Sequence, residues 1–479
     1  MPLPTIPSGN VASATGGGFS VANSIRFNGD AYLHKQLGTA TNNKICTVSL
    51  WVKPQVSDSR NTFVSGGRDG NNYQKFRTAN DAFSFYGNHS SSNNIHLECN
   101  RVLRDPSAFY HVVMAFDSTQ ASSSNRIKLY VNGVQETSFN NSTYPAEDAI
   151  CYFTESSSSD IFVGAFGRQD DTIGEQGEGY FAEVCVIDGQ ALTPTSFGQF
   201  NEDSPTIWEP IDVSGLTFGN NGFYLDFEDS SNLGNDVNGG TDLTAVSLAA
   251  TDQTTDTPTN NFCTMNVLAK SSYATLSEGN CLVTGNSSSD TGNVSSTMAA
   301  KNGKWYAECK VGGKTGDYPR PGFQHTNGTN YGRGVNGTDG GAGGQTDSGG
   351  VYASDGDKFV SDTLSSFGAS FADNDIVNLA IDCDNGAAYV GVNNTWSNSG
   401  NPGSGSSKTG AILTWTPADV TETGFAAVTY NSSFLNFNFG NPAYANSSDA
   451  ADADGYGKFE YAPPTGYFAL CTKNLAEYG

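Results

Sequence analysis

Short apolar runs separated by polar turn residues dominate the chain between residues 24 and 200. Each run has about four to eight residues, is alternating or continuously apolar, and is bounded by Gly, Asn, Asp or Ser. This pattern predicts a succession of β-strands. The runs are SIRFNG, TVSLWVKP, NTFVSGG, AFSFYG, YHVVMAFD, RIKLYVNGV, DIFVGAFG and YFAEVCVID.

Two features show how these runs are connected. Asn132-Gly133 follows the run RIKLYV and predicts a type I′ hairpin turn, which needs positive φ at both central residues. The segment ALTPTSFGQF is the one place for a short helix, with Pro194 near its first turn. The first block is therefore expected to be antiparallel.

A second all-β block is predicted for residues 263–446, with its clearest strands in NGKWYAECKV, DIVNLAIDCDNGAAYVGVNN, TGFAAVTY and SSFLNFNFGNP. Residues 201–262 read as a linker with an anchoring Trp208 and one extra strand, GFYLDFED. Residues 447–479 read as an extended tail that packs on the second block. Residues 1–23 are either a loose leader or an attachment arm. The fold class is all-β, with two antiparallel β-sandwiches of jelly-roll type in tandem.

The composition favours a β-rich fold and makes some classes of binding partner unlikely. The 479 residues include 56 Gly and only 15% charged residues, which suits strands and turns. Lys and Arg number 24 against 49 Asp and Glu, a formal net charge of -25, so nucleic acid and anionic membranes are unlikely partners. No apolar run approaches the roughly 20 residues of a membrane helix, and the N-terminal residues do not resemble a signal peptide.

Nine cysteines occur without CxxC pairs or zinc spacing. Most are expected to be free and buried, which indicates synthesis in a reducing cytoplasm. Those in or beside apolar runs are Cys46, Cys151, Cys185, Cys309 and Cys383.

Several longer motifs carry a family resemblance. RDPSAFYHVVMAFD, NRIKLYVNGVQ and GYFAEVCVIDGQALTPTSFGQF resemble the laminin-G-like, concanavalin-A-type lectin domain. GKWYAECKV, DIVNLAIDCDNGAAYVGVNN and FLNFNFG resemble a SPRY-like sandwich. NNGFYLDFEDSSNLGNDVNG, TDTPTNNFCTMN and YAPPTGYFALCTKNL look like the multi-domain arrangement of structural proteins of tailed, especially marine, phages. His111, in the Tyr-His strand start, is expected to pack or hydrogen-bond locally.

The resemblance implies a virion protein, made in the bacterial cytoplasm and carried outside on the particle. The N-terminal arm would contact other virion proteins, and the chain would form a homo-oligomer, with a trimer favoured. The leading hypothesis is a non-enzymatic tail-fibre or adhesin protein whose lectin-like loops bind host-surface polysaccharide. Alternatives are a capsid decoration or head-fibre subunit whose loops contact neighbouring subunits, and a glycan depolymerase.

Catalytic residues are not expected. Retaining glucanases of the concanavalin type place two carboxylates on one strand, about 5–5.5 Å apart. Here Glu183 is followed by Val184 and Cys185, so a structural hydrogen bond is its expected role. Asp226 and Glu228 share a face but are more simply turn carboxylates at a strand end. No G-x-S-x-G motif is present.

Two loops carry aromatic and planar polar side chains of the kind that recognise sugars. For each, an aromatic that tucks into its own domain is an equally good interpretation. The first loop, SGGRDGNNYQKF, offers Arg68, Asn71, Asn72 and Tyr73. The second, within the Gly-rich stretch 312–356, offers Tyr318, His325, Tyr331, Arg333 and Tyr352.

The acidic segment GRQDDTIGEQGEG is a weak calcium candidate through Asp170, Asp171 and Glu175, with Glu178 nearby. It matches no ordered calcium motif, and an exposed acidic loop explains it more simply. No other cofactor is expected.

Overall fold

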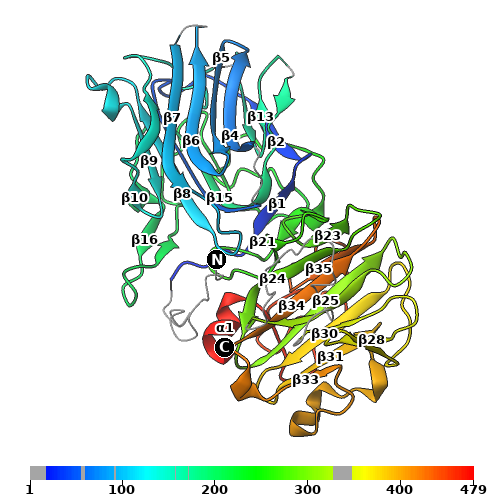
Figure 1. Ribbon diagram of the computed structural model, residues 1–479. Helices are drawn as coiled ribbons and strands as arrows, with labels where there is room; N and C mark the ends of the chain where they lie inside the picture. Colours follow the sequence, from blue (N-terminus) through cyan, green and yellow to red (C-terminus); the bar gives the residue numbers. More distant parts are fainter. Residues whose placement is uncertain (1–17, 56–59, 91–92, 157, 171, 327–347) are drawn as a thin grey trace. The chain divides into compact units, whose positions relative to one another are not determined.

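The computed structural model describes residues 18–55, 60–90, 93–156, 158–170, 172–326 and 348–479 (Figure 1). Two units follow one another along the described chain, Gly17–Thr259 and Asn260–Gly479, and each contains two large β-sheets. The predicted all-β fold of antiparallel sandwiches is confirmed. No helix in these ranges is long and apolar enough to span a membrane.

In the first unit, the sheet that contains the longest strand has the order β10-β9-β8-β3-β15-β1-β20, and β18 also pairs with β15. All its pairings are antiparallel. Its strands are β1 (Ser24–Asn28), β3 (Ile45–Pro54), β8 (Tyr110–Asp117), β9 (Ile127–Val131), β10 (Val134–Gln135), β15 (Glu178–Asp188), β18 (Phe223–Leu225) and β20 (Gln253–Thr254).

The opposite sheet of this unit has the order β11-β7-β6-β5-β4-β12-β2-β19 (Figure 1). Its strands are β2 (Tyr32–Gln36), β4 (Arg60–Asp69), β5 (Asn72–Ala79), β6 (Ala82–His89), β7 (Asn93–Val102), β11 (Phe139–Thr143), β12 (Asp160–Val163) and β19 (Thr244–Val246). Two small hairpins complete the unit: β13 (Phe166–Gly167) with β14 (Ile173–Gly174), and β16 (Gly198–Phe200) with β17 (Trp208–Pro210).

The two sheets are held together by one apolar core. Val48 and Met114 from one sheet and Phe76 and Leu97 from the other are fully buried members of the same cluster. Because side chains alternate across a strand, the residues between them point to the outer faces. The alternation in the sequence therefore marks which face of each strand lies in the core.

The expected connections are present. Asn132 and Gly133 have φ values of 48° and 77°, as the predicted hairpin turn requires. The expected short helix is a single 3-10 turn, Pro194–Ser196. Residues 201–259 do more than link: they contribute β17, β18, β19 and β20 to the first unit.

Trp208 and His111 meet on the outer face of the β8-containing sheet. His111 is fully buried, and its Nδ1 accepts a hydrogen bond from Trp208 Nε1 at 2.9 Å. The other ring nitrogen, Nε2, lies 2.8 Å from Ser49 Oγ. The local role expected for His111 is confirmed, and its principal partner comes from the segment read as a linker.

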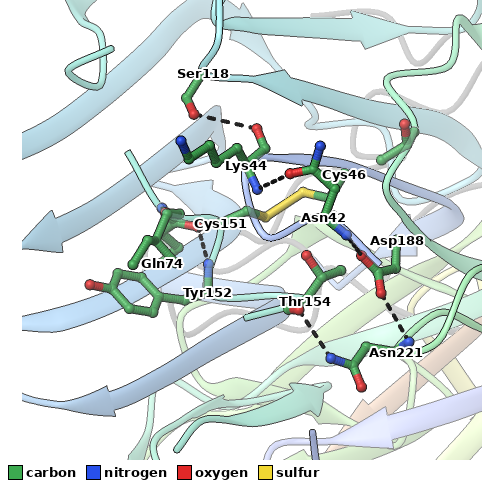
Figure 2. Close-up of a disulfide and its surroundings, with 12 residues drawn as sticks. Asn42, Lys44, Cys46, Gln74, Ser118, Cys151, Tyr152, Thr154, Asp188 and Asn221 are labelled. Carbon is green, nitrogen blue, oxygen red and sulfur yellow. Dashed lines mark hydrogen bonds between the residues drawn. A yellow bond between two sulfur atoms is a disulfide. The ribbon is translucent and has the colours of Figure 1, made fainter. Parts of the chain in front are cut away.

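One pair of cysteines corrects the expectation of free thiols. Cys46 and Cys151 form a disulfide across 105 residues of sequence, which ties the loop before β12 to β3 (Figure 2). Tyr152 N–H donates to Gln74 Oε1 beside it, at 2.9 Å. The other seven cysteines are buried and form no disulfide, which agrees with the prediction for most of the nine.

In the second unit, one sheet has the order β21-β24-β34-β26-β27-β28-β29. The other runs β22-β23-β35-β25-β30-β31-β32, with β33 beside β31 and β36 parallel to β25 (Figure 1). The strands of the first are β21 (Met265–Lys270), β24 (Gly292–Ala300), β26 (Arg320–His325), β27 (Ser348–Val351), β28 (Lys358–Val360), β29 (Thr363–Ser365) and β34 (Thr423–Thr429). Those of the second are β22 (Ala274–Ser277), β23 (Leu282–Gly285), β25 (Lys304–Gly312), β30 (Ile376–Asp382), β31 (Ala387–Val392), β32 (Thr395–Trp396), β33 (Leu413–Thr414), β35 (Phe434–Asn438) and β36 (Phe468–Ala469).

The C-terminal tail packs on the second unit and ends in the helix α1 (Thr472–Tyr478). A buried carboxylate holds it: Glu308 on β25 accepts the backbone N–H groups of Glu460 and Tyr461, each at 2.8 Å. Burial raises the pKa of Glu308 to about 7, although these hydrogen bonds oppose the rise.

Candidate functional site

The first predicted loop lies at the turn between β4 and β5. Arg68 pairs with the buried Glu155, with Nε 2.8 Å from Oε2. Asn72 Oδ1 accepts from Tyr152 Oη at 2.8 Å, and the exposed Asn71 donates its backbone N–H to Asp69. Arg68 and Asn72 thus hold the loop that contains Tyr152, whereas the ring of Tyr73 lies beside those of Tyr86 and Phe166.

The outer face of the sheet built from β4 to β7 carries the unusual side chains. Phe76, Phe85 and Leu97 point into the core, so their neighbours along the strands point outward. Those neighbours form a row across three strands, because Lys75 pairs with Tyr86 and Tyr86 pairs with His96. Aromatic and cationic groups therefore alternate on one rigid surface.

The aromatic rings form a continuous path. The centroid of Tyr86 is 6.3 Å from that of Tyr73 and 5.3 Å from that of His96. Phe166, from the hairpin β13–β14, lies 5.1 Å from Tyr73 on the other side. Tyr73, Tyr86, His96 and Phe166 are each only partly buried, so their rings retain solvent-accessible surface.

Cations lie against these rings. Lys75 Nζ is 3.7 Å from the centroid of Phe166, and the Arg77 guanidinium is 5.2 Å from that of Tyr86. Contacts of this kind contribute about 0.5–2 kcal/mol each, more when they are shielded from water. They fix the orientation of long side chains that would otherwise be mobile.

A single carboxylate completes the site. Glu175, just after β14, accepts from Lys75 Nζ at 2.9 Å, Arg77 Nη1 at 2.6 Å and Arg60 Nη1 at 3.2 Å. Burial alone would raise the pKa of Glu175, but the Lys75 hydrogen bond and the charge of Arg77 together lower it. Burial also lowers the pKa of Lys75 to about 8, against the opposing effect of Glu175.

Two of the three calcium candidates are described, and both contact basic side chains. Glu175 binds cationic side chains, and Asp170 lies 3.3 Å from Arg168 Nε. Asp171 lies outside the described residues. Within the described ranges, no group of three or more His, Cys, Asp or Glu side chains is arranged to hold a metal ion. A calcium role for these residues stays a prediction.

In the second unit, Tyr318 and Tyr352 gather around a buried arginine. The Arg320 guanidinium is 4.3 Å from the centroid of Tyr352, 4.7 Å from that of Phe359 and 5.3 Å from that of Tyr318. Tyr318 also lies 5.3 Å from Tyr430. Both tyrosines thus pack on their own unit, which was the alternative interpretation of this loop.

The remaining residues predicted in the second loop have different outcomes. The sequence places His325 in the Gly-rich stretch, whereas the structure places it in β26, 2% exposed, with Nδ1 2.9 Å from Thr423 Oγ1. It also contacts Trp415, at 4.8 Å between ring centroids, so its ring is not presented by an open loop. Tyr331 and Arg333 lie outside the described residues.

The carboxylates considered for catalysis have structural contacts. Glu183 is buried at a bulge in β15 and accepts from Tyr224 Oη at 2.6 Å. Burial raises its pKa to about 8. Asp226 Oδ1 accepts the backbone N–H of Glu228 at 3.1 Å, the turn-capping role expected for it.

Comparison with known proteins supports the prediction of a lectin-type fold for the first unit. Residues 27–171 match the sequence model of the concanavalin A-like lectin/glucanases superfamily. None of the curated proteins compared matches the chain. These comparisons do not test the resemblance to phage proteins, which stays a prediction.

Three solved structures are similar to parts of the chain. A heptameric SAP-like pentraxin from Limulus polyphemus is 17% identical, with 37% of this chain and 80% of that chain covered and a TM-score of 0.28. The SPRY domain of human HERC1 is 12% identical, with 36% of this chain and 96% of that chain covered and a TM-score of 0.26. A Bacteroides ovatus protein described as a candidate carbohydrate binder is 16% identical, with 47% of this chain and 58% of that chain covered and a TM-score of 0.33.

Most of the outer-face site was missed by reasoning from the sequence. Tyr73 was identified, but Arg77 and Tyr86 were not singled out, and Lys75 was passed over within the predicted loop SGGRDGNNYQKF. A usable signal was present in the run YQKFRTA, whose outward positions are Tyr, Lys and Arg in a chain poor in positive charge.

Proposed function

We propose that the first unit binds carbohydrate on the outer face of the β4–β7 sheet and that binding, rather than catalysis, is the activity of the chain. The observation that supports this most is the row of partly exposed rings from Phe166 through Tyr73 and Tyr86 to His96, with cationic hydrogen-bond donors beside it. Sugar rings present apolar faces and hydroxyl groups, which such a surface complements.

The test is a binding titration of the intact chain against immobilised polysaccharides, with Tyr86→Ala as the probe variant. Tyr86 lies at the centre of the row, so its removal should cost about 2 kcal/mol, or roughly a thirtyfold loss of affinity. Tyr273→Ala is the matched control, because Tyr273 is also partly buried but belongs to the second unit. Equal binding by both variants and the unaltered chain would place the site elsewhere.

The resemblance to tailed-phage proteins makes a host-surface polysaccharide the expected ligand and a virion the expected location, as a tail-fibre or adhesin component. The Cys46–Cys151 disulfide is consistent with a final location outside a reducing cytoplasm. Antibody labelling of intact virions tests the location: label on tails or fibres favours receptor binding, and label across the capsid favours a decoration protein. The trimer is tested by light scattering.

A further inference from the structure

Positive charge is scarce in this chain, yet it is concentrated at the candidate site. The whole chain has 24 Lys and Arg against 49 Asp and Glu. At the site Arg60, Lys75 and Arg77 all contact one carboxylate, Glu175, so three positive charges meet one negative charge. The difference, 3 − 1, leaves this group of four side chains with a net charge of two positive.

The carboxylate and the cations belong to different elements. Arg60 is on β4, and Lys75 and Arg77 are on β5, within the eight-stranded sheet. Glu175 follows β14, a two-residue strand paired only with β13 among the described strands. The cations therefore lie on a rigid scaffold, whereas their partner is carried by a small hairpin.

The backbone of Glu175 indicates that the ion pairs hold it in place. Its φ is 43°, in the left-handed region that costs a non-glycine residue roughly 1–2 kcal/mol. Such a conformation persists when surrounding contacts offset the cost, and the three cations supply those contacts. A competing anion would release Glu175 to relax.

The two arginines also have N–H donors that the Glu175 carboxylate does not use. Arg77 Nε is buried without a hydrogen-bond partner, an arrangement that is uncommon in folded proteins. The side chain of Arg60 is 61% exposed, so a ligand can reach it from solvent. An arginine fork suits a planar carboxylate, which it can bind through two parallel hydrogen bonds.

We propose that this site takes an acidic saccharide, whose carboxylate binds Arg60, Lys75 and Arg77 while its ring lies on Tyr86, and that Glu175 is a built-in competitor for the same cations. This inference rests on the proposed carbohydrate binding and adds the class of sugar. A neutral sugar would leave the surplus charge without a partner.

Because Glu175 competes with the ligand, its removal is expected to strengthen binding rather than weaken it. Glu175→Gln removes the internal anion and should tighten binding of an acidic saccharide by about tenfold, because the guanidinium groups of Arg60 and Arg77 are then free for the ligand. If Glu175 only positions the site, the same substitution should weaken binding. Arg60→Gln should weaken it by about tenfold, and this side chain is exposed enough for the variant to fold normally.

Glu98→Gln is the matched control. Glu98 is on β7, two strands from β5 on the same face, and its side chain is 22% exposed against 19% for Glu175. The substitution changes the net charge equally but touches none of the three cations, since Glu98 contacts His96 and Asn140. It should leave the affinity for acidic saccharide within about twofold.

The experiment is calorimetric titration of the full chain with two matched pairs of oligosaccharides at 150 mM salt: oligogalacturonate with its methyl ester, and oligomannuronate with oligomannose. We expect the acidic member of at least one pair to bind about tenfold more tightly, and Glu175→Gln to increase that preference. Equal binding of both members overturns this inference and leaves carbohydrate binding intact. Binding of neither member of either pair, with no binding in the polysaccharide titration, overturns both.

Discussion

Acid should destabilise the first unit through His111. Its ring is fully buried, between Trp51 at 4.8 Å and Trp208 at 5.9 Å from ring centroid to ring centroid. An indole N–H only donates, so the 2.9 Å bond from Trp208 requires an unprotonated Nδ1 on His111. The neutral ring must then carry its hydrogen on Nε2 and donate it to Ser49 Oγ, 2.8 Å away.

Burial lowers the pKa of His111 to about 3, from 6.5 in an exposed chain. Because the folded pKa is the lower one, the contribution to stability is complete above pH 6.5 and is lost as the pH falls towards 3. At pH 4.5, two pH units below 6.5, the unfolded chain gains about 2.7 kcal/mol from binding the proton that the folded chain excludes.

Two measurements check this. In ¹³C-labelled protein, one of the five histidines should keep its neutral, Nε2-protonated ring signature from pH 8 to 4.5, and His111→Gln should remove that resonance. The free energy of unfolding in urea, followed by hydrogen exchange in Tyr110–Asp117, should fall between pH 7.5 and 4.5. This fall should be about 2.7 kcal/mol smaller in His111→Gln. His34→Gln, at a partly exposed position, should keep the full loss. A His111 resonance that titrates near pH 6.5 would refute the reasoning.

Three further predictions concern stability. Asp256→Asn removes the carboxylate that lies 2.8 Å from Lys53 Nζ, a side chain only 1% exposed, and should cost about 3–5 kcal/mol in urea unfolding; the double variant Lys53→Met/Asp256→Leu should recover most of it. Reduction of Cys46–Cys151, which closes a span of 105 residues, should lower the free energy of unfolding by about 4–5 kcal/mol, and equal urea midpoints with and without reductant would contradict this. Glu308→Ala removes the acceptor of two partly buried backbone N–H groups of the C-terminal tail, so unfolding should be easier by about 1–3 kcal/mol and exchange in the tail faster.

The fold was largely predictable from local pattern because strands and tight turns are local. Asn132-Gly133 specifies its turn through backbone conformations that Asn and Gly tolerate. The role of residues 201–259 was only partly predicted: the extra strand in GFYLDFED is β18 (Phe223–Leu225), but its partner β15 lies far away in sequence, and strands as short as β17, β19 and β20 have too few residues for a periodic signal. The Cys46–Cys151 bond was missed for the same reason: nine cysteines allow many pairings, and spacing does not choose among them.

The candidate site was only partly predictable because it depends on which charges meet. Glu175 was read as an acidic loop residue with calcium-ligand chemistry, and nothing local shows that Arg60, Lys75 and Arg77 converge on it. Tyr73 was found because it follows a turn, where binding residues are commonly sought. Side chains in mid-strand are usually read only as facing in or out, so Tyr86 was not recognised.

The proposed competitor also bears on affinity. Lys75 and Arg77 are tolerated at 6% side-chain exposure because Glu175 compensates their charge. A ligand carboxylate must displace that partner, so part of its interaction energy is cancelled, and a single site should bind weakly. Weak single sites suit a surface protein present in many copies, because linked binding events gain about 10²–10⁴ in overall affinity without new contacts. If the chain forms the expected oligomer, binding to a polymeric acidic glycan should therefore exceed binding to its short oligosaccharides, and Glu175→Gln should narrow that difference by strengthening each site.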